Sequence, residues 1–306
     1  MTSILHWFSD PLQYDFMKRA LIEAVVTGVV TGVIGTYIVL RGLSFIGDAL
    51  SHAIFPGIVI AFLLGQSIFA GAAIFGLLTS TAIAVVATSS RVKEDTAIGV
   101  MFAGAFALGI VLISSSRNFT RDLASFLFGN VLGVTQSDII LSVVVGLFVL
   151  GLVVLFYREL LITSFDRVAA EAMGIKVFRL DLLLLVLISL TIVVSLRAVG
   201  NILVVAMLVT PAAAARQLTD RLPVMMLLSA AIGALSGAAG LFVSFHRDVA
   251  AGGTIVLVST VIFLAVWLLA PNHGYLTTRL ARRGLAQAEP EANILFESPQ
   301  IRTRPR

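Results

Sequence analysis

Nine long apolar stretches follow one another along the chain, separated by short polar segments. A helix needs about 20 predominantly apolar residues to cross the hydrocarbon core of a bilayer. We therefore predict an all-α polytopic membrane protein with about nine transmembrane helices. A different assignment of the mixed segment 114–135, or of the shorter stretches, gives eight or ten. The nine predicted spans are 20–40, 43–64, 68–88, 97–113, 139–157, 180–196, 202–215, 224–245 and 254–270.

The spacing of these stretches divides the chain into three parts. Residues 1–19 carry Trp7, Phe8 and Tyr14 among polar residues, and aromatic rings favour the headgroup zone, so we expect an N-terminal interfacial segment. Residues 20–271 form the transmembrane domain. Residues 272–306 are polar and contain three prolines, which favours a disordered tail.

Composition agrees with this assignment and excludes other classes. The chain has 306 residues, of which 58% are hydrophobic and 12% are charged, and no cysteine is available for a disulfide or a thiolate metal site. Its basic residues lie in short loops and in the tail, so they report orientation rather than nucleic-acid binding. With the C-terminus on the cytoplasmic side, 15 of the 21 Lys and Arg fall on that side, which the positive-inside rule favours.

Asp48 and His52 lie four residues apart inside the second span, a spacing that places them on one helix face. Ser44 and Ser51 fall on or beside that face. A carboxylate with a neutral imidazole suits a divalent metal such as manganese, iron or zinc. An acid inside a membrane also serves in proton relays or in structural hydrogen bonds, and the residues alone leave these three alternatives open.

Two prolines predict helix breaks within spans, because proline has no N–H to donate within a helix. Pro56 follows His52 by four residues, and Pro211 lies in the seventh span. Broken helices expose backbone carbonyls where transporters bind ions. We therefore expect breaks at Pro56 and at Pro211.

Two further groups of residues could serve the same function. His246 and Asp248, at the outer end of the eighth span, are either an entrance contact for a cation or part of a solvated loop. On the cytoplasmic side, Asp166 is a candidate N-cap and Gly174 a candidate C-terminal residue of a short helix. That helix is either an ordinary amphipathic loop helix or a docking element, because the small residues around Ala169 allow close approach.

The motifs of several enzyme classes are absent. The sequence has no G-x-x-x-x-G-K-[ST] loop, so the chain does not bind ATP by a P-loop. It has no H-E-x-x-H motif of zinc proteases and no nucleophile elbow of hydrolases. We therefore expect a transport protein without enzymatic activity of its own.

At the level of motifs, the chain resembles the permease subunits of bacterial ABC importers for zinc, manganese and iron. Residues 40–57, around Gly47-Asp48-Ala49-Leu50-Ser51-His52, resemble the signature of that family, and residues 200–216 resemble a second family block. The resemblance extends from about residue 12 to residue 271. One departure is the segment 248–252, which lacks the proline of the family's Asp-x-Pro-x-Gly pattern.

The resemblance implies a dimeric, type II-like ABC importer permease in the bacterial cytoplasmic membrane. It implies a second permease protomer (identical or not), a separate ATPase subunit and an extracellular metal-binding protein as partners. Asp48 and His52 match the positions that hold the ion in transit. The resemblance implies that this ion is Mn²⁺, Zn²⁺ or Fe²⁺, that it is transported, and that no cofactor is bound permanently. Asp166, Ala169, Glu171 and Gly174 match the contact with the ATPase. The alternative function is a secondary metal-ion carrier or channel.

Overall fold

The computed structural model describes residues 7, 9–88, 92–114, 133–270 and 274. Over these residues the chain is helical and contains no strand. The elements are η1 (Pro11–Gln13), α2 (Asp15–Arg41), α3 (Ile46–Ala53), α4 (Phe55–Leu63), α5 (Ile68–Ala87), α6 (Glu94–Ser114), α8 (Gln136–Leu155), α9 (Tyr157–Phe165), α10 (Arg167–Ala172), α11 (Val177–Val199), α12 (Asn201–Leu218), α13 (Leu222–Arg247) and α14 (Ala251–Leu269).

These helices confirm the predicted fold class. Eight segments of the described chain are long and apolar enough to cross a membrane, where α3 and α4 together count as one. The apolar part of α12, Leu203–Leu218, is shorter and occupies the position of the seventh predicted span. Most of the mixed segment 114–135, the first six residues and the predicted tail 272–306 lie outside the described residues, apart from Gly274.

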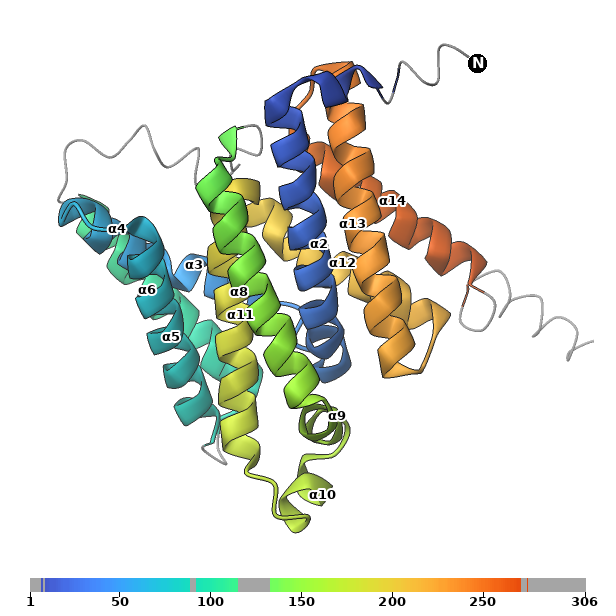
Figure 1. Cartoon of the computed structure of the whole chain (residues 1–306). Helices are drawn as coiled ribbons and strands as arrows, with labels where there is room; N and C mark the ends of the chain where they lie inside the picture. The colour runs from blue at the N-terminus through green and yellow to red at the C-terminus, as the bar shows by residue number, and fades with distance from the viewer. Residues whose placement is uncertain (1–6, 8, 89–91, 115–132, 271–273, 275–306) are drawn as a thin grey trace, which may run out of the picture.

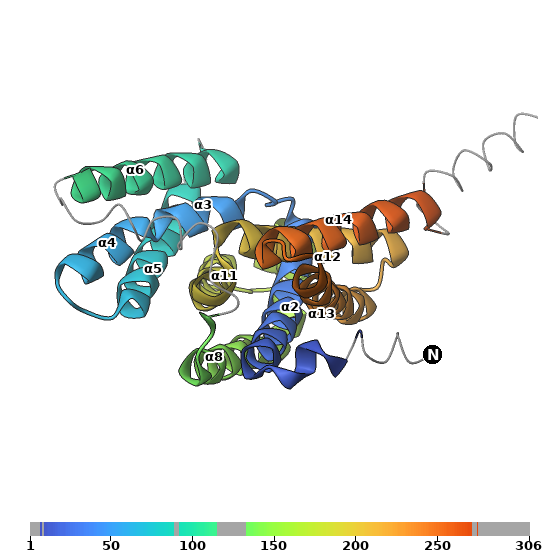
Figure 2. The same cartoon turned by 90° about the horizontal axis from the view of Figure 1, so that it is seen from above.

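Two groups of helices lie side by side, with α8 and α11 between them (Figures 1 and 2). One group contains α2, α12, α13 and α14, and the other contains α3, α4, α5 and α6. α11 contacts members of both groups, and α8 contacts α2 and α11. The short helices α9 and α10 lie at one end of the bundle, opposite the turn between α13 and α14 (Figure 1).

Glycines allow α2 and α13 to meet backbone against backbone. A Cβ on Gly28 would lie 2.6 Å from the carbonyl carbon of Gly233, a distance shorter than Cβ atoms adopt in real structures, so only glycine fits here. One turn further along, Ser229 donates a hydrogen bond of 2.7 Å to the Gly32 carbonyl. Small residues that bring helices this close are the usual means of packing in a membrane, where the hydrophobic effect does not drive association.

The outward faces of several long helices are apolar. Leu78 of α5, Leu147 of α8 and Leu257 of α14 are each more than half exposed. Faces of this kind would be unstable in water over so large an area, and they match the environment of lipid chains. The core of the bundle, by contrast, contains buried serines and threonines that bond to backbone carbonyls, such as Thr31 to Thr27.

Two details differ from the predicted spans. The second span consists of two helices, α3 and α4, which are separated at Ile54, two residues before the break that we predict at Pro56. Pro56 lies in the first turn of α4, where the missing N–H is tolerated. The predicted break at Pro211 is wrong, because α12 continues through this residue. Proline removes one hydrogen bond there, and packing against α2, α13 and α14 holds the helix together.

Candidate metal site

α3 begins where the end of α2 forces the chain to turn. Gly42 adopts a left-handed conformation (φ 72°) at the C-terminus of α2, a position that glycine occupies without steric cost. The Leu43 N–H then donates to the Ile38 carbonyl, which closes the turn. After this turn, α3 runs for eight residues and carries Asp48 in its first turn and His52 in its last.

The structure brings Asp48 and His52 together as the spacing predicts. The Nδ1 atom of His52 lies 2.9 Å from the backbone carbonyl of Asp48 and 3.5 Å from its Oδ1 atom. A carbonyl oxygen only accepts, so Nδ1 carries the ring proton in the first contact. Metal binding by the ring would therefore use Nε2, in the neutral form that metals prefer.

The two side chains differ in their exposure. Asp48 is 52% exposed, whereas His52 is 23% exposed. His52 is covered by two phenylalanines of α6, with ring centroids at 5.3 Å for Phe106 and 5.7 Å for Phe102, both edge to face. An apolar wall on one side reduces the access of water, and electrostatic attraction to a cation is stronger where water is excluded.

Ser44 and Ser51 do not join this pair in the structure. Ser44 lies exposed in the turn before α3. Ser51 is fully buried, and its hydroxyl donates to the Gly47 carbonyl at 2.7 Å. Their role in a pathway therefore remains a prediction.

The donor set within one chain is small. No group of three or more His, Cys, Asp or Glu side chains that could hold a metal ion occurs among the described residues. Manganese and iron prefer a shell of about six ligands. Asp48 and His52 alone would leave most of that shell to water or to another chain.

His246 and Asp248 lie at a different end of the molecule. Both are exposed, at the turn between α13 and α14, whereas α3 lies at mid-height of the bundle (Figure 1). The His246 ring is stacked on Trp7 at 4.4 Å, and its Nδ1 atom contacts the Phe242 carbonyl at 2.8 Å. Asp248 has a left-handed backbone (φ 51°) that ends α13. Of the two alternatives, this geometry favours a solvated turn.

The short helix on the opposite end has the predicted caps. The Asp166 carboxylate accepts a hydrogen bond of 2.9 Å from the Ala169 N–H at the start of α10. Gly174 follows the helix in a left-handed conformation (φ 79°), as predicted for its end. Glu171 is exposed, and so are three large apolar side chains around the helix, those of Phe165, Val168 and Met173. α10 therefore offers a mixed apolar and charged surface at this end of the bundle.

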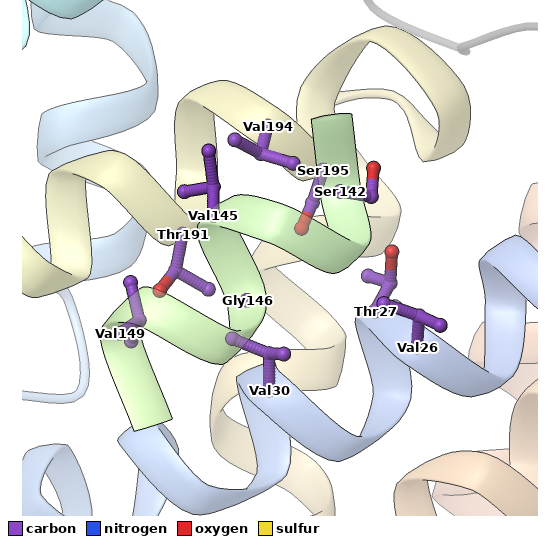
Figure 3. Close-up of a pocket in the computed structure, with 10 residues that line it drawn as sticks. All are labelled: Val26, Thr27, Val30, Ser142, Val145, Gly146, Val149, Thr191, Val194 and Ser195. Carbon is purple, nitrogen blue, oxygen red and sulfur yellow. The ribbon is translucent and has the colours of Figure 1, made fainter. Parts of the chain in front are cut away.

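The described structure also contains polar contacts that the sequence analysis missed. Glu23 is fully buried in α2 and accepts hydrogen bonds from Ser142 of α8 (2.7 Å) and from Thr27 (3.4 Å). A cavity of about 10 Å³, with room for about one water molecule, lies beside Ser142 and Thr27, between α2, α8 and α11 (Figure 3). The sequence feature that could have indicated this group is Glu23 itself, an acidic residue inside an apolar span. None of the predicted site residues lines this cavity.

A second missed group lies near α10. Arg41 at the end of α2 forms an ion pair with Asp181 of α11, and Arg167 of α10 forms one with Glu94 of α6. Asp181 is a charged residue inside the predicted sixth span, and such a residue is a sequence signal for a functional or paired group. Its partners, however, are far away in sequence and depend on the fold.

The sequence matches a protein family and is similar to several transport proteins. The ABC 3 transport family matches residues 13–270. The manganese transport system membrane protein MntC of Halalkalibacterium halodurans is 48% identical over 277 residues, which cover 90% of this chain and 95% of MntC. The chelated iron transport system membrane protein YfeC of Yersinia pestis is 36% identical over 295 residues, covering 95% of this chain and all of YfeC.

A solved structure agrees with these relatives. A chain of PsaBC from Streptococcus pneumoniae, in complex with Fab, is 42% identical and superimposes with a TM-score of 0.79, over 90% of this chain and 99% of that chain. The matches confirm the resemblance that residues 40–57 and 200–216 indicate. The chain is a membrane permease and belongs to the ABC 3 transport family.

Proposed function

We propose that this chain is the membrane-spanning subunit of an ABC importer for Mn²⁺, in which Asp48 and His52 hold the ion in transit. The observation that carries the proposal is the pair itself, with Nδ1 of His52 3.5 Å from the Asp48 carboxylate on one half-exposed face of α3. MntC is named a manganese transport protein, and YfeC a chelated iron transport protein. Fe²⁺ and Zn²⁺ are therefore the competing substrates.

The ligand types suit this task. A carboxylate oxygen and an imidazole nitrogen bind manganese and iron, and the absence of cysteine removes the ligand that would favour softer metals. Two donors per chain give an incomplete shell, which lets an ion exchange more readily than a closed structural site does. A second permease protomer would bring a second Asp48 and His52 and raise the number of protein ligands to about four.

The second element of the proposal is the partner that supplies energy. The described chain has no ATP-binding loop, so ATP hydrolysis requires a separate ATPase subunit. Asp166, Ala169, Glu171 and Gly174, with the exposed side chains of α10 around them, would form its docking surface. A metal-binding protein would deliver the ion at the opposite end of the bundle.

Orientation follows from this assignment. Docking of a cytoplasmic ATPase at α10 places that end of the bundle at the cytoplasm. The basic residues favour the same orientation, because Arg167 begins α10 and Arg41, at the end of α2, pairs with the same Asp181 carboxylate as Arg167. The C-terminus would then be cytoplasmic and the α13–α14 turn would face the outside of the cytoplasmic membrane.

Transport of radioactive metal into sealed vesicles tests the proposal. The vesicles contain the chain with its candidate ATPase and binding protein, and Mn²⁺, Fe²⁺ and Zn²⁺ are compared with and without ATP. We expect ATP-dependent uptake with Mn²⁺ preferred. We expect His52→Ala to lower the rate of Mn²⁺ uptake at least about 10-fold, because removing a metal ligand should weaken metal binding at least as much as removing a residue that only orients a ligand.

A different result would refute each of the three parts of the proposal. Uptake that does not need ATP would indicate a secondary carrier or channel and overturn the ABC assignment. Preferred uptake of another metal would overturn the choice of substrate. Uptake by His52→Ala at the wild-type rate would overturn the site while leaving the transporter class intact.

A further inference from the structure

Arg41, at the end of α2, joins three helices through one guanidinium group. Its Nη1 atom forms an ion pair of 2.5 Å with the Asp181 carboxylate of α11. Its Nη2 and Nε atoms donate hydrogen bonds of 3.1 Å to Thr163 and Ser164 of α9. The Arg41 side chain is only 5% exposed, so its charge depends on these contacts.

Arg167, the first residue of α10, extends this group to a fourth and a fifth helix. Its Nη2 atom lies 2.7 Å from the Glu94 carboxylate, at the start of α6, and 3.4 Å from the second oxygen of Asp181. Two arginines and two carboxylates therefore alternate in one group beside α10, the helix at the lower end of the bundle in Figure 1. We call Arg41, Glu94, Arg167 and Asp181 the ionic linkage.

The ionic linkage connects α10 with both walls of the candidate metal site. Arg41 is followed by the Gly42 turn and then by α3, which carries Asp48 and His52. Glu94 begins α6, and the Phe102 and Phe106 rings that cover His52 lie about two and three turns further along it. A displacement of α10 would therefore act on both helices through charged contacts.

We propose that the ionic linkage transmits the movement of α10 to α3 and α6, and so positions the Asp48–His52 pair against its α6 cover during transport. This inference rests on the proposed function, in which the ATPase docks at α10. Its four members are positioning residues, since none belongs to the Asp48–His52 pair that would hold the ion. A linkage made of side-chain ion pairs suits this task, because both ends stay attached while the helices change their angle.

The number of Mn²⁺ ions transported per ATP hydrolysed tests the linkage. It is measured in vesicles that contain the complete transporter, for Glu94→Gln, Arg167→Gln and the double variant. We expect each single variant to lower this ratio about 10-fold while ATP hydrolysis stays within about twofold of wild type. The double variant should lower the ratio no further than Arg167→Gln does, because the contact that Glu94→Gln removes is already lost in Arg167→Gln.

Two control variants separate this role from others. Arg216→Gln breaks an exposed ion pair of 2.9 Å with Asp220, at the end of α12, and should leave the ratio unchanged. Arg167→Lys retains the positive charge and should keep the ratio within about threefold of wild type. If one of the two amide variants is unstable, the other still removes the Arg167–Glu94 contact and tests the linkage from the opposite side.

The results distinguish failure of the linkage from failure of the function. A wild-type transporter that takes up Mn²⁺ without ATP would overturn the proposed function, and the linkage with it. ATP-driven uptake by wild type with an unchanged ratio in Arg167→Gln would overturn the linkage alone. A double variant whose loss equals the product of the two single losses would also overturn it, because Arg167 and Glu94 would then act independently.

Discussion

Two regions of the molecule each carry a histidine and an aspartate, and their histidines make almost the same local contact. The Nδ1 atom of His52 lies 2.9 Å from the Asp48 carbonyl oxygen, and the Nδ1 atom of His246 lies 2.8 Å from the Phe242 carbonyl oxygen, in each case four residues earlier. The aspartates differ. Asp48 lies one turn before its histidine on the same helix face, whereas Asp248 follows its histidine beyond the end of α13.

The surroundings of the two histidines differ as well. His52 is covered edge to face by Phe102 and Phe106 from a neighbouring helix, and His246 is exposed and stacked on Trp7. If Asp48 and His52 hold the ion as proposed, residue types and a local hydrogen bond are insufficient to define such a site. The helix face on which the acid lies, and the packing around the imidazole ring, are what distinguish the two regions.

Replacing each aspartate in turn should give the largest difference between the two regions. Asp48→Ala should lower Mn²⁺ uptake by at least about 100-fold, because it removes a charged ligand of the ion. Asp248→Ala should keep uptake within about twofold of wild type, as is usual for a surface residue. Uptake is measured in the vesicles described above, with equal amounts of assembled transporter.

Either variant could contradict this expectation. Normal uptake by Asp48→Ala would exclude the carboxylate as a ligand. A large loss in Asp248→Ala, with normal ATP hydrolysis, would instead support the entrance contact that the sequence left open.

The helices next to the two regions also differ in how tightly their glycines are packed. A Cβ on Gly57 of α4 would clash with the Gly71 carbonyl oxygen of α5, whereas a Cβ on Gly253 of α14 would meet nothing within 4 Å. Gly57→Ala should therefore destabilise the chain by about 1–3 kcal/mol through overpacking. Gly253→Ala should cause no loss, because alanine favours the helix by up to about 1 kcal/mol.

Thermal unfolding of the purified variants in one detergent measures both effects. Equal midpoints for Gly57→Ala and wild type would show that α4 and α5 can separate at no cost. The tight contact between α4 and α5, next to α3, would then contribute nothing to stability.

The smallest expected effect concerns the backbone of Asp248. Its left-handed conformation (φ 51°) is unfavourable for alanine and easy for glycine. Asp248→Gly should therefore be about 1 kcal/mol more stable than Asp248→Ala. The difference is read from the same unfolding midpoints, and equal stability would mean that the turn relaxes around the new residue.

Much of this architecture could be predicted from the chain because it depends on local properties. Span positions follow from apolar length, and the Asp48–His52 contact follows from helix periodicity. The caps of α10 follow from Asp166 and Gly174. The break predicted at Pro211 failed because packing against neighbouring helices outweighs the local cost of proline.

The remaining features depend on contacts between distant segments. Phe102 and Phe106 are indistinguishable by pattern from other apolar residues of their span, and only the approach of α6 to α3 makes them a cover for His52. The pairing of Arg41 with Asp181 joins residues 140 positions apart. Sequence shows that such charges exist, and the fold decides which of them meet.

The glycine contacts between α2 and α13 also limit which parts of the molecule can move. Where backbone touches backbone, no flexible side chain can adjust to a new position. A shift of α2 by one residue, with a turn of about 100° about its axis, would bring the side chain of Thr27 or Val29 against the Gly233 backbone. If the chain transports an ion as proposed, we therefore expect α2 and α13 to move together as one rigid body. We expect the rearrangement that admits or releases the ion at contacts between longer side chains, such as those of α3 and α6.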